Sequence, residues 1–284
     1  MKLSEGMARI GTETAFQVLA RAKKLEAQGI DVVHLEIGEP DFDTPANVVE
    51  AGRQALADGY THYTPAAGIA ELRATIATYV GRTRGIPVAP ENVVVVPGGK
   101  PIIFFSILAC VDAGDEVIMP NPSFPIYESM VNFVGARPIF VSLREEDGFG
   151  FDLDVFADSL SSRTRMVILN SPSNPTGGVL SREQVEAIAE MLANRPDIVV
   201  LSDEIYSRML YDGHHVSIAS EPGMQAQTII LDGFSKTYAM TGWRLGYGVM
   251  NPELAEAIAN LQVNATSCVN AATQMAGIEA LTGP

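Results

Sequence analysis

Asp232-Gly233-Phe234-Ser235-Lys236-Thr237-Tyr238-Ala239-Met240-Thr241-Gly242-Trp243-Arg244-Leu245-Gly246 forms a polar turn with an apolar run on either side. A lysine in such a turn is unusual, because lysine is almost never buried without a partner. Desolvation favours the neutral amine of Lys236, which is a nucleophile toward carbonyl compounds. Ser235 adds a hydroxyl, and Arg244 adds a planar guanidinium suited to phosphate. These groups together predict a site for pyridoxal phosphate.

The apolar runs of the chain have the length and composition of strands that are buried on both faces. They are Val93–Val96, Glu116–Met119, Pro138–Val141, Met166–Leu169, Ile198–Leu201, Thr228–Leu231 and Leu245–Val249. Helical patterns separate most of them, at Ile102–Val111, Phe124–Phe133, Arg182–Leu192 and Pro252–Gln262. This alternation predicts a three-layer α/β fold, with a mostly parallel seven-stranded sheet and helices on both faces. The chemistry is then expected in loops at the strand ends.

The first third of the chain has a different pattern. Helices are expected at Ala15–Gln28, Asn47–Asp58 and Ile69–Tyr79, and the segment from His34 predicts a short strand that ends at Gly38-Glu39-Pro40.

Two further motifs precede the lysine turn. They are Ser173-Asn174-Pro175-Thr176-Gly177 and Ser202-Asp203-Glu204-Ile205-Tyr206. With the lysine turn, they closely resemble the motifs of fold-type I, class I/II aminotransferases, in the same order and most like the prokaryotic aspartate group. Three ordered motifs are far more specific than one. The resemblance runs from about Leu35 to the last residue, and it implies the large domain of the pyridoxal-phosphate-dependent transferase fold.

The resemblance also implies residue roles. Lys236 corresponds to the catalytic lysine that holds the cofactor as an imine and moves a proton. Asp203 corresponds to the partner of the pyridine nitrogen, while Asn174 and Tyr206 correspond to donors to the phenolic oxygen. Asn174 is also expected near the substrate. Arg244, Ser235 and the backbone of Gly99 and Lys100 correspond to the phosphate site.

Other positions carry two interpretations. Phe124 matches the aromatic that stacks on the pyridine ring, but core packing fits equally. Tyr63 matches a tyrosine that reaches the cofactor phosphate of the partner subunit, although it also suits loop packing. Gly38 and Lys100 match residues near the substrate; a turn glycine and a solvated lysine at a helix start are the alternatives.

Composition excludes several classes of function. The chain has 34 acidic and 19 basic residues and a formal charge of -15, which disfavours nucleic acid and anionic membranes as partners. Two cysteines cannot build a disulfide framework, and no apolar run reaches membrane-spanning length. Residues 1–20 lack the apolar core of a signal peptide, so a cytoplasmic protein is expected. His214 and His215 lack further ligands, and no metal site is predicted.

The resemblance divides the chain at residue 45. Residues 1–45 correspond to an N-terminal arm with part of a small domain, and residues 46–284 to the cofactor-binding large domain. The rest of the small domain, with the arginine that grips the substrate α-carboxylate, is expected to be absent, since no Lys or Arg follows Arg244. Cofactor binding with little turnover is therefore expected of this polypeptide.

The resemblance implies an aminotransferase that moves an amino group between an L-amino acid, aspartate-like or broad, and a 2-oxo acid. A homodimer is expected, because the site is shared across the interface in the family. A pyridoxal-phosphate-dependent C–S lyase or another fold-type I enzyme is an alternative. A non-catalytic, cofactor-binding dimeric module is a further alternative, although it has no need of an electron sink.

Overall fold

A computed structural model describes residues 1–11 and 14–284. Among these residues, seven strands form one sheet in the order β1-β7-β6-β5-β4-β2-β3. They are β1 (Val93–Val96), β2 (Glu116–Asn121), β3 (Arg137–Ser142), β4 (Thr164–Asn170), β5 (Val199–Asp203), β6 (Thr228–Gly233) and β7 (Gly246–Val249). β7 runs antiparallel to β1 and β6, and the other pairs are parallel. The predicted mostly parallel sheet is confirmed.

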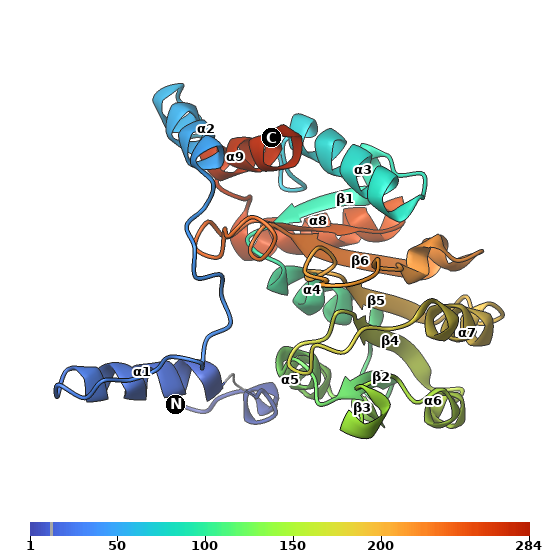
Figure 1. The fold of residues 1–284 in the computed structure, drawn as a ribbon. Helices are drawn as coiled ribbons and strands as arrows, with labels where there is room; N and C mark the ends of the chain where they lie inside the picture. Colours follow the sequence, from blue (N-terminus) through green and yellow to red (C-terminus); the bar gives the residue numbers. More distant parts are fainter. Residues whose placement is uncertain (12–13) are drawn as a thin grey trace.

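Helices cover both faces of this sheet (Figure 1). The α-helices of the described residues are α1 (Thr14–Glu26), α2 (Ala46–Ala57), α3 (Ala70–Arg84), α4 (Lys100–Cys110), α5 (Ile126–Val134), α6 (Leu153–Ser159), α7 (Arg182–Leu192), α8 (Pro252–Thr266) and α9 (Ala271–Thr282), of which α1 lies outside the two layers. One apolar core lies between the sheet and α4, α5 and α8; on the other face, α3 and α9 enclose a second core, and α6 and α7 a third. None of the described helices combines the length and apolar character needed to cross a membrane.

The burial of β1 explains why its sequence is apolar throughout. All four of its valines are at most 1% exposed. Val94 and Val96 pack in the core beneath α4 and α8, while Val93 and Val95 pack beneath α3 and α9. Successive side chains of a strand point to opposite faces, so a strand covered on both faces has no polar position. Some helices are longer than predicted: α3 continues to Arg84 and α8 to Thr266. Two helices, α6 and α9, had not been predicted.

The segment that joins α1 to α2 departs from the prediction. No strand forms within residues 31–45, so the prediction of a short strand before Gly38 is wrong. Val33 and Leu35 are 82% and 88% exposed, and a strand requires a neighbour whose backbone can pair with it. The segment is instead extended beside the sheet, and α1 projects away from the body of the molecule (Figure 1). Thr44 fixes its end by donating a 2.6 Å hydrogen bond to the carbonyl oxygen of Ala239.

Candidate active site

One edge of the sheet gathers the loops that carry the predicted site. β4, β5 and β6 are parallel, so their final residues meet there; Asn170 lies beside Asp203, and Asp203 beside Leu231. The loop after β1 opens at the same edge, because β1 and β6 both pair antiparallel with β7. Motifs far apart in the sequence are therefore brought together by strand direction alone.

Lys236 is half-buried in the turn after β6. Its ammonium group donates a hydrogen bond to the carbonyl oxygen of Gly38, and Nζ lies 6.0 Å from the centre of the Tyr206 ring. Burial lowers the pKa of Lys236 below its ordinary value; Glu39 opposes this shift, while Arg244 and Lys100 add to it. The lowered pKa favours the neutral, nucleophilic amine. The structure thus places Gly38 next to the lysine, and its expected role near the substrate stays a prediction.

Asp203 is the last residue of β5 and is only 4% exposed. Its Oδ2 accepts a 2.7 Å hydrogen bond from the hydroxyl of Tyr127, and its Oδ1 accepts one of 3.2 Å from the backbone N–H of Ile205. Burial raises the pKa of Asp203 to about 6, even though both hydrogen bonds favour the carboxylate. The carboxyl is therefore held in one orientation and is mostly ionised at neutral pH.

Sequence reasoning missed Tyr127. It lies on α5, its side chain is fully buried, and its pKa is raised well above the ordinary value by burial and by the charge of Asp203. The hydroxyl therefore keeps its proton and acts as a donor. The sequence contains no signal for this role, because an aromatic residue in a helix pattern is equally suited to the core.

Asn174 and Tyr206 lie together, as predicted. Their side chains are hydrogen-bonded, and burial raises the pKa of the Tyr206 hydroxyl to about 12. Asn170, which had not been predicted, holds the Asn174 loop in place: its Oδ1 accepts a 2.7 Å hydrogen bond from the backbone N–H of Asn174, and its Nδ2 donates one of 3.1 Å to the backbone oxygen of Asp203. The asparagine loop is thus tied to the end of β5.

The loop after β1 forms a cradle beneath Arg244. Gly98 has φ 85°, and a Cβ built there would lie 2.1 Å from Nη2 of Arg244. A Cβ on Gly246 would lie 2.7 Å from the carbonyl carbon of Gly98. Arg244 is exposed, and its Nη1 donates a 2.8 Å hydrogen bond to the carbonyl oxygen of Thr241. A guanidinium above a glycine turn at the start of a helix fits a phosphate group.

The remaining predicted residues differ in their surroundings. Gly99 immediately precedes α4, and Ser235 is half-buried beside Lys236. The ring of Phe124 meets that of Tyr127 edge-on, with 5.8 Å between their centres, and Lys100 Nζ lies 5.2 Å from the centre of the Phe124 ring.

Tyr63 contrasts with the residues above. It lies in the loop between α2 and α3 and is 90% exposed, so the described chain does not enclose its ring.

Comparisons with known proteins agree with this arrangement. The family model for aminotransferase class I and II matches residues 30–284. The chain is 41% identical over 282 residues to an aspartate/prephenate aminotransferase of Thermus thermophilus, covering 99% of this chain and 72% of that protein. It is 39% identical over 278 residues to a (5-formylfuran-3-yl)methyl phosphate transaminase of Methanocaldococcus jannaschii, covering 98% and 72%.

A solved structure has the same fold. It is an aspartate aminotransferase from Thermus thermophilus with maleate, which superimposes with a TM-score of 0.96 at 39% identity and covers 99% of this chain and 73% of that one. The lysine turn, the buried aspartate and the glycine cradle thus lie on a shared architecture, and the chain belongs to the class I and II aminotransferases.

Proposed function

We propose that this site binds pyridoxal 5′-phosphate through Lys236 and transfers an amino group between an L-amino acid and a 2-oxo acid. One observation carries the proposal: adjoining strand ends present a lysine whose pKa is lowered and a buried carboxylate that is fixed by Tyr127. When bound, this cofactor supplies an electron sink for charge that develops at the substrate Cα.

The residues of the chain divide the remaining work. Lys236 would hold the cofactor through its neutral amine, and the same amine would move the proton at the substrate Cα. The carboxylate of Asp203 accepts a hydrogen bond from the protonated ring nitrogen and keeps that proton in place. Asn174 and Tyr206 donate to the phenolic oxygen of the cofactor. Burial favours the protonation states that Lys236 and Tyr206 need, whereas the carboxylate of Asp203 is favoured, against burial, by its hydrogen bonds from Tyr127 and Ile205.

The phosphate end is assigned by charge and space. We assign Arg244, Ser235 and the backbone N–H groups of Gly99 and Lys100 to the cofactor phosphate. The cradle at Gly98 supports this assignment, since any side chain there would displace the guanidinium. Phe124 is assigned to the face of the cofactor ring, and Gly38 and Lys100 to the substrate.

The substrate class is an amino acid with a second anionic group, aspartate first. The Thermus thermophilus relative is named for aspartate and prephenate, and the Methanocaldococcus jannaschii relative for a furan phosphate. Lys100 adds positive charge near Lys236, on the side assigned to the substrate, although Glu39 places a negative charge there as well. The positive charge of Lys100 favours a dianionic substrate.

We further propose a cytoplasmic homodimer in which the partner's copy of Tyr63 completes the phosphate site. The 90% exposure of this ring on the single chain supports a contact outside it. We also assign residues 1–45 to an arm with part of a small domain and residues 46–284 to the cofactor-binding domain, because α1 lies apart from the body (Figure 1). Sedimentation should give a dimer mass at micromolar concentration, and a monomer that binds cofactor would contradict this assembly.

The test of function combines covalent labelling with a product assay. The protein is incubated with pyridoxal phosphate, reduced with borohydride and mapped by mass spectrometry, and Lys236 should carry the label. Lys23→Ala, at an exposed lysine of α1, is the matched control and should label normally. Aspartate with a 2-oxo acid should then give amino transfer. Labelling of a different lysine, or release of pyruvate, ammonia and a thiol from cystathionine with no amino transfer from aspartate, would contradict the proposal.

A further inference from the structure

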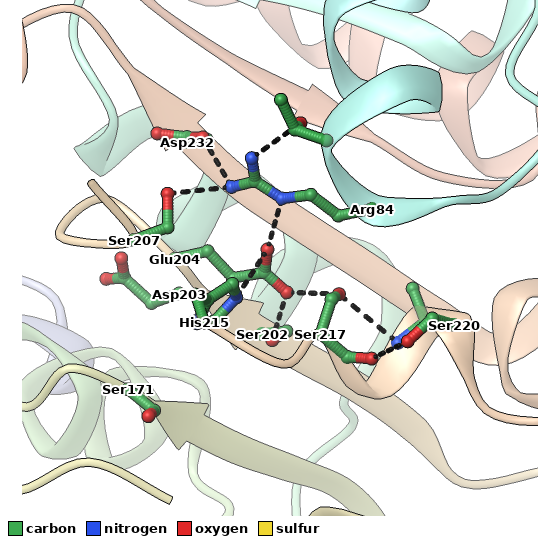
Figure 2. Close-up of polar contacts among 12 residues, drawn as sticks. Arg84, Ser171, Ser202, Asp203, Glu204, Ser207, His215, Ser217, Ser220 and Asp232 are labelled. Atoms are coloured by element: carbon green, nitrogen blue, oxygen red, sulfur yellow. Dashed lines mark hydrogen bonds and ion pairs between the residues drawn. The ribbon is translucent and has the colours of Figure 1, made fainter. Parts of the chain in front are cut away.

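A cluster of charged side chains lies buried directly behind the proposed site and takes no part in the roles above. Arg84, Glu204 and Asp232 have side chains that are 2%, 0% and 4% exposed. They come from the last turn of α3, from the residue after β5 and from the end of β6 (Figure 2). Buried charges are expensive unless they are paired and hydrogen-bonded, so this placement calls for an explanation.

The guanidinium of Arg84 bridges the two carboxylates. Nε donates to Oε2 of Glu204 at 2.9 Å, and Nη2 donates to Oδ2 of Asp232 at 2.7 Å. Nη2 also donates to the hydroxyl of Ser207 at 2.9 Å, while Nη1 donates to that of Thr83 at 2.9 Å. The planar fork of arginine reaches all four acceptors at once, which a lysine ammonium has no geometry to do.

We propose that Arg84 is a positioning residue that ties the end of β5 to the end of β6 and keeps Asp203 ionised by neutralising the carboxylates beside it. The inference rests on the proposed function, in which the carboxylate of Asp203 serves the cofactor ring. Arg84 touches neither substrate nor cofactor in this role, and it acts through Glu204 and Asp232.

The backbone explains how the tie reaches the site. Glu204 follows Asp203 directly, and its N–H donates a 2.8 Å hydrogen bond to the carbonyl oxygen of Leu231 on β6. Asp232 comes next on β6, four residues before Lys236, and its Oδ1 accepts a 2.7 Å hydrogen bond from the N–H of Gly233. A shift of either carboxylate therefore moves the strand end that carries a proposed cofactor residue.

Electrostatics supply the second link. Burial raises the pKa of Asp203, and the charges of Asp232 and Glu204 raise it further. Burial would also raise the pKa of Glu204, but His215 and Arg84 outweigh it and hold the pKa below the ordinary range. Burial raises the pKa of Asp232, and the charge of Arg84 opposes that rise. Without Arg84, the two carboxylates beside Asp203 would lose their shared counter-charge. Asp203 would then take up a proton more readily and fail to hold the proton on the cofactor ring nitrogen.

Among the described groups that contact Glu204, only Arg84 carries a permanent positive charge. Ser202 and Ser217 donate hydrogen bonds to Oε1 of Glu204, and neither hydroxyl carries a charge. His215 Nε2 lies 3.0 Å from Oε2 of Glu204 and is charged only when protonated. Arg84 is the permanent cation of the cluster, and its pKa is raised further by Glu204 and Asp232 in spite of the opposing effect of burial.

The experiment follows the ionisation of Asp203 in protein without cofactor. Aspartate carrying carbon-13 in its side-chain carboxyl is incorporated, and the Asp203 signal is identified by its loss in Asp203→Asn. In Arg84→Met, the titration midpoint of Asp203 should rise by about one pH unit or more. At a pH below both midpoints, the affinity for pyridoxal phosphate should fall about tenfold for each unit of that shift, because the ionised fraction of Asp203 falls by the same factor. An unchanged midpoint would overturn the proposal.

Two further variants separate charge from shape. Arg84→Met combined with Glu204→Gln and Asp232→Asn removes all three charges and nearly keeps the volumes, so the Asp203 midpoint should return to the wild-type value or below it. A midpoint that stays raised would contradict the electrostatic role. If Arg84→Met does not fold, Arg84→Lys should shift the midpoint in the same direction by a smaller amount, and the absence of any shift would again overturn the proposal.

The matched control is Arg163→Met. Arg163 Nη2 donates to Oε1 of buried Glu116 at 2.6 Å, so it also pairs with a buried carboxylate, but its own side chain is 63% exposed and it lies at the opposite edge of the sheet, where β2 begins. This variant should lower stability without moving the Asp203 midpoint. Failure of Lys236 to take up the label would contradict the proposed function and leave this titration unaffected, so the two ideas fail separately.

Discussion

The two ends of the proposed cofactor site are built differently. At the ring-nitrogen end, Asp203 and Tyr127 are at most 4% exposed and hydrogen-bonded to each other. At the phosphate end, Arg244 is exposed, its side chain hydrogen-bonds only to backbone carbonyl oxygens among the described residues, and Tyr63 is 90% exposed. The first end is rigid because the chain itself satisfies its polar groups. The second presents donors whose remaining hydrogen bonds are free for a ligand.

This difference indicates a division of labour. A carboxylate that must keep a proton on a ring nitrogen needs a fixed position and a low-dielectric environment, which only a core supplies. A phosphate carries its own strong charge and is bound well by exposed donors. Changes at the buried end should therefore act through the protonation of Asp203, whereas changes at the exposed end should weaken cofactor binding without altering that protonation.

The largest effect is expected at the lysine that joins the two ends. Lys236→Ala should abolish the borohydride-stable cofactor label, because no other amine is held at that position. Amino transfer should fall by at least about 10²–10⁴-fold through loss of the proton-moving group alone. Peptide mapping and a transfer assay measure both. A label that persists on a neighbouring lysine would mean that the turn after β6 does not define the site.

Asp203→Asn tests the buried end through pH. Burial raises the pKa of Asp203 from the ordinary 3.8 to about 6. Asp203 binds its proton more tightly in the folded chain than in the unfolded chain. The folded protein therefore loses stability as the pH rises between those two values. The wild type should lose about 2 kcal/mol of unfolding free energy relative to Asp203→Asn over that range. Urea unfolding of both proteins at each end of the range measures it; a constant difference between them would show that Asp203 is not desolvated.

Gly98→Ala tests the exposed end. A methyl group there would overlap Nη2 of Arg244, and the left-handed φ of 85° disfavours a side chain. Placing an alanine in this left-handed backbone conformation costs about 1–2 kcal/mol of stability. Displacing the guanidinium should weaken pyridoxal phosphate binding by a further charge-assisted hydrogen bond, about 1.5–3 kcal/mol. Gly59→Ala, which has a similar φ and open space, is the control and should lower stability only. Equal cofactor affinity in the two variants would show that the glycine loop after β1 does not contribute to cofactor binding.

The smallest effect is expected at Tyr63. Because the ring is 90% exposed, Tyr63→Ala should change the unfolding free energy of the single chain by no more than about 0.5 kcal/mol. Cofactor affinity should fall by about 0.5–1.5 kcal/mol, the value of one hydrogen bond, and only where the chain is dimeric. Titration of cofactor at protein concentrations above and below the dimer midpoint distinguishes this from a loop residue. A loss of affinity that is the same in the monomer would rule out a role across the interface.

Sequence patterns by themselves determined the sheet and the lysine motif. Each strand run is short, apolar and local, so burial on two faces is visible in residues such as Val93–Val96 without knowledge of the fold. Lys236, Asp203, Asn174 and Tyr206 were predicted because the three ordered motifs that contain them resemble those of the class I/II aminotransferases. Each follows a recognisable strand, and parallel strands bring their ends to one edge. The prediction of a short strand before Gly38 failed because a strand needs a neighbouring strand to pair with, and local composition does not show whether one is present.

Only the tertiary structure decided which side chains support those residues. Tyr127 is 76 positions from Asp203, and Arg84 is 120 positions from Glu204 and 148 from Asp232. A tyrosine in an apolar helix and an arginine at a helix end are ordinary in sequence, since both suit a core or a surface equally. Their meaning arises from three-dimensional packing, which buries them against carboxylates that need a proton donor or a counter-charge. Such partnerships depend on long-range contacts, and no local periodicity encodes them.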